Sequence, residues 1–166
     1  MARVRVPGSR MPRPIVTVPD ESLRRVASPV QDFAAVPDLA RDMLETMYAA
    51  PGRGLAAPQV GVGLRLFVMD PGWKEGRPEP RVLVNPEVTW SSPETEVAEE
   101  GCLSIPGRTS RVRRPVAVRL RFQDEGGAPR EEGFDGFAAR CAQHEIDHLD
   151  GVLCIDREEP AGEGAA

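Results

Sequence analysis

Hydrophobic positions recur with a helical period between residues 37 and 50. Within the segment PDLARDMLETMYAA, four apolar side chains fall on one face of a helix: Leu39, Met43, Leu44 and Met47. Acidic residues stand near its start, and Pro51 and Gly52 follow its end, as expected at helix boundaries. Methionines at this spacing are usually core residues. The pattern therefore predicts an amphipathic helix packed on the core.

Three further segments have the pattern of β-strands. Residues 64–70 (LRLFVMD) and 81–90 (RVLVNPEVTW) are short runs rich in β-forming residues, bounded by prolines and glycines. Residues 115–124 alternate between apolar side chains and arginines, which predicts a strand with one solvated face. The turn DEGG at 124–127 then predicts that residues 129–134 return as its hairpin partner.

The segment from Asp135 to about Leu149 returns to a helical period. Four of its side chains fall near one face: Phe137, Cys141, His144 and His148. Strands that precede a helix in this way predict an α+β fold. Since no internal repeat or low-complexity linker interrupts the chain, we expect one domain over residues 15–158. Residues 1–14 and 159–166 are predicted to form a flexible N-terminal tail and a disordered C-terminal tail.

Composition and charge exclude several classes of protein. With 40% hydrophobic residues the chain can build a core, so disorder throughout is excluded. A formal net charge of −5 argues against an electrostatic nucleic-acid binder. No apolar run approaches the roughly 18 residues of a membrane span, and residues 1–14 lack the apolar stretch of a signal peptide. Three cysteines form no paired framework, so we expect a reduced, cytoplasmic setting.

Candidate chemistry is concentrated in the sequence QHEIDHLDG at residues 143–151. It holds both histidines of the chain, His144 and His148, with Glu145 directly after the first. On a helix, residues i and i+4 point the same way, so two imidazoles at this spacing can bind one metal ion. Glu145 then flanks the ion and can contact its water without being a ligand, which is the division of roles in an HExxH motif.

A catalytic metal site needs a third protein ligand, and the spacing leaves the choice open among acids and cysteines. Four acids follow Gly151: Asp156, Glu158, Glu159 and Glu163. Cys141 shares the helix face but stands about 10 Å along the axis from His148, too far for one ion to bind both. Cys154 lies in an apolar stretch and is expected to be a buried small residue. Cys102 follows a glycine and precedes a nearby proline, where an exposed turn can aim a thiolate.

Three motifs, in order along the chain, resemble the signature motifs of the peptide deformylase family: GRGLAAPQ (52–59), EGCLS (100–104) and QHEIDHLDG (143–151). Residues 15–30 are also similar to the family's opening, and the resemblance extends to about residue 156. It implies an α+β fold with small antiparallel sheets around the metal-bearing helix. It also implies that the protein removes the N-formyl group from the formyl-methionine of nascent polypeptides by hydrolysis and releases formate.

The resemblance also implies the reacting groups of the site. The metal is implied to have one water and three protein ligands: Cys102, His144 and His148. The family implies Fe²⁺ as the native ion of bacterial members, while Zn²⁺, Ni²⁺ and Co²⁺ also suit this donor set in the protein as isolated. Glu145 is implied as general base, and Gln59 with the backbone N–H of Leu103 as donors to the carbonyl oxygen of the substrate.

Four further residues are implied to bind the substrate: Gly54, Glu100, Gly101 and Cys141. Gly54 and the alanines after it have small side chains, which let a peptide backbone approach closely. Glu100 is implied to pair with the arginine twelve residues after the ligand cysteine, which is Arg114 in this chain.

The sequence departs from the family around the cleft. Arg53 and Arg140 stand where apolar pocket residues are common, and Thr109 replaces a frequent arginine. The two arginines either extend outward over apolar surface or line the mouth of the cleft, where they would favour peptides with Asp or Glu after the methionine. The short acidic C-terminus lacks the helix with which some members dock on ribosomes, so any ribosome association is expected to be transient.

Other functions compete with this interpretation. An HExxH metallopeptidase of other specificity would cleave internal peptide bonds. An inactive relative acting as a binding protein would normally lose Glu145, Cys102 or Gln59, and all three are present. A structural metal module usually has four protein ligands, and the sequence offers three good ones. A deformylase copy with a specialised role, such as tolerance of an inhibitor, would share all of these residues.

Overall fold

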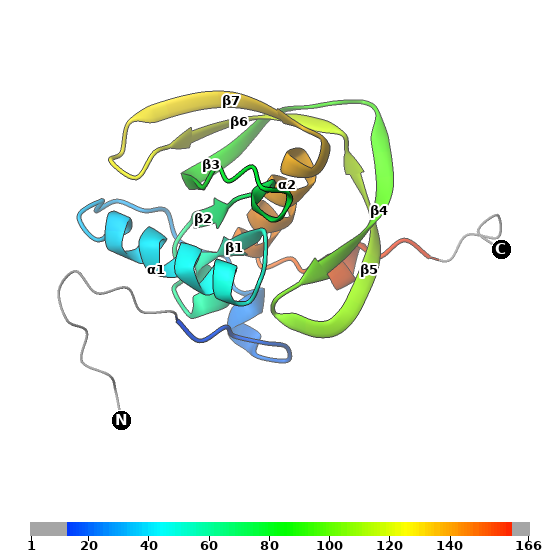
Figure 1. The fold of residues 1–166 in the computed structure, drawn as a ribbon, viewed down its shortest axis with the longest axis horizontal. Coiled ribbons are helices and arrows are strands. Elements are labelled where there is room, and N and C mark those ends of the chain that lie inside the picture. Colours follow the sequence, from blue (N-terminus) through cyan, green and yellow to red (C-terminus); the bar gives the residue numbers. More distant parts are fainter. Residues whose placement is uncertain (1–12, 161–166) are drawn as a thin grey trace.

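The computed structural model describes residues 13–160, and its strands form two antiparallel sheets (Figure 1). The larger sheet has five strands, in the spatial order β1 (Gly54–Ala56), β2 (Leu66–Met69), β3 (Arg81–Ser91), β6 (Ala117–Gln123) and β7 (Pro129–Asp135). The smaller sheet pairs β4 (Thr95–Cys102) with β5 (Ile105–Pro115). The α-helices are α1 (Val36–Ala49) and α2 (Gly136–Leu149). Short 3₁₀ helices are η1 (Glu21–Arg24), η2 (Ala57–Val60), η3 (Trp73–Glu75) and η4 (Cys154–Arg157). The predicted α+β fold is confirmed.

The elements predicted from hydrophobic periodicity are present. The two helical segments are α1 and α2, and the three strand segments are β2, β3 and β6. The expected hairpin partner is β7, which pairs with β6 over its whole length. Val118, Leu120 and Phe122 of β6 are buried while the arginines between them are exposed, so the predicted solvated face is confirmed.

The hydrophobic pattern gives no prediction for β4 and β5. Their sequences, TEVAEEGC and IPGRTSRVRRP, are rich in charged residues. The buried positions of β5 include Ser110 and Arg114, where an alternating strand would carry apolar side chains. Opposite charges face each other across the pair, as at Glu99 and Arg111, and such pairs stabilise a sheet. Pairing and charge therefore form this sheet where hydrophobic alternation is weak.

Strand β2 is buried on both faces and separates two parts of the core. Leu66 and Val68 pack on the side of α1, together with Met43 and the other apolar residues of that helix. Phe67 and Met69 point to the opposite face and pack on the side of α2. Each such side chain stabilises the fold by roughly 1.5–3 kcal/mol relative to an exposed one. The prediction that the methionines of α1 belong to the core is confirmed.

Helix α2 lies between the larger sheet and the β4–β5 pair, so several of its polar residues are buried (Figure 1). The helix ends at Leu149, and Gly151 has a φ of 73°, the left-handed conformation that terminates many helices. A Cβ on Gly151 would collide with the carbonyl of Arg24. The chain then turns back and packs Leu153 and Cys154 against Val112 of β5. This third cluster joins β5 to the segment that follows α2.

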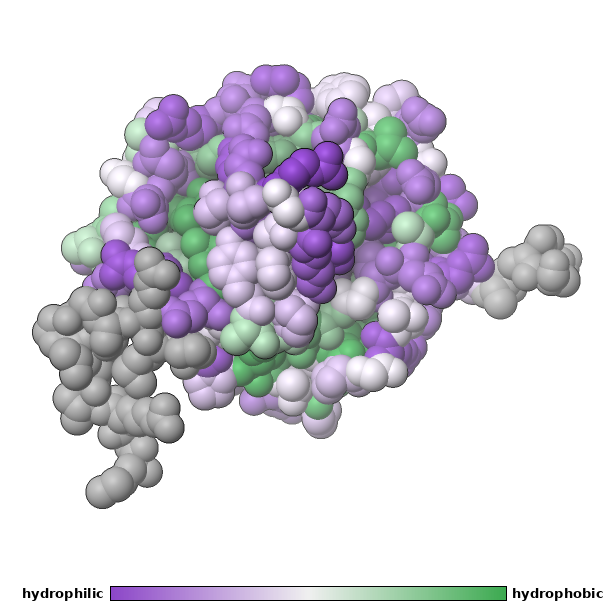
Figure 2. Space-filling model, in the orientation of Figure 1, coloured by the Kyte–Doolittle hydropathy of each residue, from purple (hydrophilic) through white to green (hydrophobic). Residues whose placement is uncertain are grey.

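The predicted tails lie largely outside the described residues. Of the tail residues that are described, Arg13 donates its N–H to the hydroxyl of Thr46 on α1 (2.6 Å). Glu159 donates its N–H to the carbonyl of Arg111 on β5 (2.7 Å). The division into one domain and two tails stays a prediction. In the described part of the chain, no helix combines the length and the hydropathy of a membrane span. Hydrophilic residues cover much of the face in Figure 2, with hydrophobic residues in the recesses between them.

Candidate metal centre and cleft

Two elements bring together three side chains that could hold a metal ion. His144 and His148 come from successive turns of α2, and Cys102 is the last residue of β4. Their ligand atoms lie within 4.8 Å of one another, and no other such group of His, Cys, Asp and Glu occurs within residues 13–160. The Sγ of Cys102 is 3.3 Å from the Nε2 of His148, and the two imidazole centroids are 5.1 Å apart.

This donor set fits one divalent ion. Ligands of a tetrahedral site lie about 2.0–2.3 Å from the metal, and hence about 3.3–3.8 Å from one another, a spacing that small movements of these side chains reach. One thiolate and two imidazoles suit Fe²⁺, Zn²⁺, Co²⁺ or Ni²⁺. Three protein ligands leave a coordination position open, as in catalytic rather than structural sites. The arrangement therefore argues against a structural metal module.

The carboxylate of Glu100 orients the ring of His144. Its Oε1 accepts the Nδ1–H of His144 (2.8 Å), which leaves Nε2 as the atom available to a metal. Arg114 donates through Nε to Oε2 (2.6 Å) and through Nη2 to Oε1 (2.9 Å), so the predicted pair with Glu100 is confirmed. Burial alone would raise the pKa of Glu100, but the hydrogen bonds from His144 and Arg114 outweigh burial and lower this pKa to about 2. Glu100 is therefore ionised.

The surroundings of His148 keep its ring neutral. Burial lowers the pKa of His148 well below its ordinary value, and the charge of His144 lowers it further. A neutral imidazole keeps one nitrogen lone pair, and Nε2 is the nitrogen that faces Cys102. His148 is thus in the protonation state that a metal ligand requires.

Glu145 lies on α2 beside β1. It is 4% exposed, and its Oε1 has no hydrogen-bond partner among the described residues. Burial raises the pKa of Glu145 to about 7, although the charge of His144 acts in the opposite direction. A carboxylate with a pKa near neutrality can accept a proton and return it. Gly54 gives this side chain room, because a Cβ there would lie 2.6 Å from the Oε2 of Glu145 and 2.7 Å from the Sγ of Cys141.

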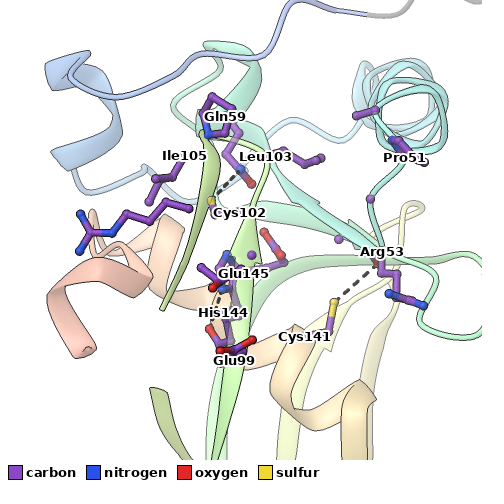
Figure 3. A pocket seen from close by; sticks show the side chains of 18 of the residues that line it. Pro51, Arg53, Gln59, Glu99, Cys102, Leu103, Ile105, Cys141, His144 and Glu145 are labelled. Atoms are coloured by element: carbon purple, nitrogen blue, oxygen red, sulfur yellow. Dashed lines mark hydrogen bonds and ion pairs between the residues drawn. The ribbon is translucent and has the colours of Figure 1, made fainter. Parts of the chain in front are cut away.

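Gln59 lies on the other side of Cys102 from His144 and Glu145 (Figure 3). Its Oε1 accepts the N–H of Ala56 (2.9 Å), so the amide nitrogen is directed toward the site. This Nε2 donates to the hydroxyl of Ser104 (3.0 Å) and lies 3.7 Å from the Sγ of Cys102. Leu103 follows Cys102 in the turn between β4 and β5 and also lines the cleft. The amide of Gln59 is therefore an uncharged donor held beside Cys102.

The site opens into a cleft of about 650 Å³. The four residues implied to bind substrate line this cleft: Gly54, Glu100, Gly101 and Cys141. The thiol of Cys141 donates to the carbonyl of Arg53 (3.6 Å), as Figure 3 shows, and burial raises the pKa of this thiol well above its ordinary value. Cys141 is therefore a neutral wall residue and not a nucleophile.

The two arginines of the cleft have different surroundings. The Nη2 of Arg53 pairs with Glu75 (2.8 Å), and its guanidinium carbon is 5.3 Å from the ring centroid of Phe137. Both Arg53 and Arg140 line the cleft, which agrees with the second of the two alternatives drawn from the sequence. Outward extension is wrong for Arg140, whose side chain is 11% exposed and donates to Glu100 (2.6 Å). The buried carboxylate of Glu100 is a stronger partner than solvent at this position.

The other candidate ligands lie away from this group. Each downstream acid that the structure describes pairs with an arginine: Asp156 with Arg24, Glu158 with Arg108, and Glu159 with Arg113. Glu163 lies outside the described residues. Cys154 is 3% exposed within an apolar cluster, as predicted.

Three residues at the site have no role in the sequence analysis. Ser104 is buried and accepts the amide of Gln59. Asp147 accepts from Arg114 (2.9 Å) and from Arg157 (2.6 Å), although it stands inside the histidine motif. Trp73 donates its indole N–H to the carbonyl of Gly52 (2.8 Å). Of the three, only Asp147 could have been singled out from the sequence, because it directly precedes His148 and so lies near the helix face that carries the histidines.

Comparisons with known proteins agree with one another. A family model described as polypeptide deformylase matches residues 12–163. A peptide deformylase of Afipia carboxidovorans is 54% identical over 145 residues, which are 87% of this chain and 85% of that protein. The crystal structure of peptide deformylase from Thermotoga maritima is 45% identical with a TM-score of 0.85, over 92% of this chain and all of that one. A Met-Ala-Ser-bound peptide deformylase from Acinetobacter baumannii is 33% identical with a TM-score of 0.84, over 90% and 99% of the two chains.

Proposed function

The chain belongs to the polypeptide deformylase family, and we propose that its Cys102, His144 and His148 hold the metal ion at which the family's reaction takes place. It is a hydrolase that removes the N-formyl group from nascent polypeptides. The observation that carries the assignment of residues is the convergence of a Cys-His-His group, a buried carboxylate and a fixed amide donor on one cleft. When bound, a divalent ion lowers the pKa of a coordinated water to about 7 and polarises a carbonyl oxygen.

Glu145 is the proposed carrier of the proton. Its unpartnered Oε1 takes a proton from the attacking water, whose oxygen forms a bond to the formyl carbon. The C–N bond then breaks, and the proton returns from Glu145 to the leaving nitrogen. The products are formate and a free amino terminus. The pKa of about 7 lets one group serve in both directions near neutral pH.

Gln59 and Leu103 are the proposed donors to the formyl oxygen. The side-chain amide of Gln59 cannot rotate freely, because its Oε1 is bonded to the backbone of Ala56. The N–H of Leu103 is held by the turn that follows Cys102. Donors fixed before the reaction stabilise the negative charge that develops on the oxygen without a cost of reorganisation.

The substrate peptide is proposed to lie between β1 and the end of β4. Gly54 and Gly101 bound this part of the cleft, and neither presents a side chain to a peptide backbone. Phe137 and Cys141 are proposed to contact the methionine side chain. The Met-Ala-Ser bound to the Acinetobacter baumannii protein supports a methionyl peptide as the occupant.

The native ion, the location and the ribosome are further parts of the proposal. Fe²⁺ is proposed as the native ion, since the thiolate and two imidazoles suit it and the sequence resembles bacterial members. A cytoplasmic location and transient ribosome association follow from a substrate that is a nascent chain. Metal analysis of protein isolated without oxygen tests the first of these, and ribosome co-sedimentation tests the last.

Formate release tests the proposed function. Fe²⁺-loaded protein, prepared without oxygen, is mixed with formyl-Met-Ala-Ser, and formate is measured against free amine. Equal amounts of both are expected, and acetyl-Met-Ala-Ser should react far more slowly because its extra methyl group must fit at the reacting carbon. Cleavage of internal bonds in an unformylated peptide would instead support the metallopeptidase. Metal binding without formate would support an inactive binding protein.

A further inference from the structure

Arg140 makes contacts that connect three elements of the site. It stands one helical turn before His144 on α2. Its Nη1 donates to the Oε2 of Glu100 (2.6 Å) and to the carbonyl of Val112 (2.9 Å). Its Nη2 donates to the carbonyl of Glu96 (2.7 Å). One guanidinium therefore ties α2 to β4, through Glu96 and Glu100, and to β5, through Val112.

These contacts complete the hydrogen bonding of Glu100. Its Oε1 accepts from His144 and Arg114, and its Oε2 accepts from Arg114 and Arg140. A carboxylate has about four lone-pair sites, so every acceptor position is used. Glu100 therefore has one preferred orientation, and its hydrogen bond with Nδ1 fixes the orientation of the His144 ring.

Arg114 alone does not give Glu100 the same support. Its Nη1 is directed to Asp147 (2.9 Å), so its charge is shared between two buried carboxylates. Arg140 is the second guanidinium on Glu100, and it comes from the helix that carries the histidines. Without Arg140, the Oε2 of Glu100 would keep only the Nε–H of Arg114, and the bond from His144 to Oε1 would be the remaining link from α2 to Glu100.

We propose that Arg140 is a positioning residue for metal binding: through Glu100 it fixes the orientation of the His144 ring and the separation of α2 from β4, which carries Cys102. The proposal rests on the proposed function of Cys102, His144 and His148 as ligands. Arg140 acts on two of these three ligands, one through a carboxylate and one through a strand. It is not a group that touches the reacting atoms.

The test compares Arg140→Leu and Arg140→Lys with a control at Arg65. Arg65 is also half-buried and also holds α2, because it donates to the carbonyl of Leu149 (2.9 Å) and to Asp150 (2.9 Å). It does not contact Glu100. Each variant is loaded with Zn²⁺, and the release of the ion to a chelator is followed in time. Formate release by metal-saturated protein gives kcat and KM, and thermal unfolding gives Tm.

Arg140→Leu should release Zn²⁺ about 10–100-fold faster than the unaltered protein, the usual effect of losing a partner of a metal ligand. At saturating metal, kcat should fall more than KM rises. Arg140→Lys should recover part of the loss, since an ammonium can reach Glu100 but cannot also hold both carbonyls. Arg65→Leu should lower Tm without changing the release rate.

Three outcomes would overturn the proposal. One is an unchanged release rate in a folded Arg140→Leu or Arg140→Lys protein. The second is an equal acceleration in Arg65→Leu, which would mean that any loosening of α2 has this effect. The third is a change in KM alone, which would make Arg140 only a wall of the cleft. If the unaltered protein releases no formate, the proposed function fails, while the release rates still decide the role of Arg140.

Discussion

The contact between β1 and α2 makes Gly54 the most sensitive small residue of the cleft. The added Cβ of Gly54→Ala would lie 2.6 Å from the Oε2 of Glu145 and 2.7 Å from the Sγ of Cys141, whereas ordinary contacts begin at 3.4 Å. Both neighbours are side-chain atoms of α2 that line the cleft, so either these atoms shift or the helix moves away from β1. Relief of the collision requires the Glu145 carboxylate, alone or together with α2, to move by about 0.8 Å.

A displacement of this size should reduce catalysis far more than stability. Overpacking of a core costs about 1–3 kcal/mol, which corresponds to a Tm lower by about 2–12 °C in a chain of this length. A misplacement of about 1 Å between a catalytic group and its substrate can cost about 10²-fold in rate. We therefore expect kcat/KM of Gly54→Ala for formyl-Met-Ala-Ser to fall by about 10²-fold while the protein stays folded and binds metal.

The assay measures formate release at equal metal occupancy, with Gly63→Ala as the matched control. A Cβ on Gly63 meets nothing within 4 Å, so the control adds the same methyl group without a collision. It should keep its kcat/KM within about twofold, as surface substitutions away from a site usually do. Unchanged kcat/KM in metal-replete Gly54→Ala would refute the view that the separation of β1 from Glu145 sets the geometry of the reaction.

Three further predictions concern the metal, the oxyanion donor and the cleft rim. Cys102→Ala should lose its bound metal while Cys154→Ala keeps it, as measured by elemental analysis; full occupancy in Cys102→Ala would remove this cysteine from the ligand set. Gln59→Leu should retain metal and lose about 10²–10³-fold in kcat, and a change confined to KM would contradict its role as a donor. Glu75→Gln should remove the ion-pair partner of Arg53 and raise the preference for formyl-Met-Ala-Glu over formyl-Met-Ala-Lys by up to about fivefold at low salt. Arg53→Ala should show no preference between the two peptides. An unchanged ratio of their kcat/KM values in Glu75→Gln would mean that the rim of the cleft does not select by charge.

Sequence periodicity predicts the elements that bury apolar surface, and it fails where polar groups are buried. The helices and β6 follow hydrophobic periods, β2 and β3 are runs of β-forming residues, and β7 follows from the turn before it, so all of these were predicted; the short strand β1 was not. The pair β4–β5 was not, because the inner face of β5 carries the polar residues Ser110 and Arg114. Arg114 can be buried because Glu100 and Asp147 offer it charged partners, which no local pattern records.

The site residues divide in a similar way. Spacing on one helix predicts the histidine pair and Glu145, since three residues within one turn and a half have a fixed relation. The proposed third ligand comes from a strand, β4, and not from the helix. Only the resemblance to a family selects Cys102 from the alternatives. The surroundings of Arg140 depend on how closely β4 and β5 approach α2. The sequence shows only that the residue is charged, which favours an exposed side chain. In the structure Arg140 instead forms a largely buried ion pair with Glu100.

Glu145→Gln tests the account most directly, because it removes a proton acceptor and keeps the size of the side chain. The measurement is the rate of formate release from formyl-Met-Ala-Ser by Glu145→Gln and unaltered protein at equal, verified metal content. We expect full metal binding and a kcat lower by at least about 10²-fold, the scale of general base catalysis. A kcat near that of the unaltered protein, with the metal in place, would contradict the assignment of Glu145 as the group that moves the proton.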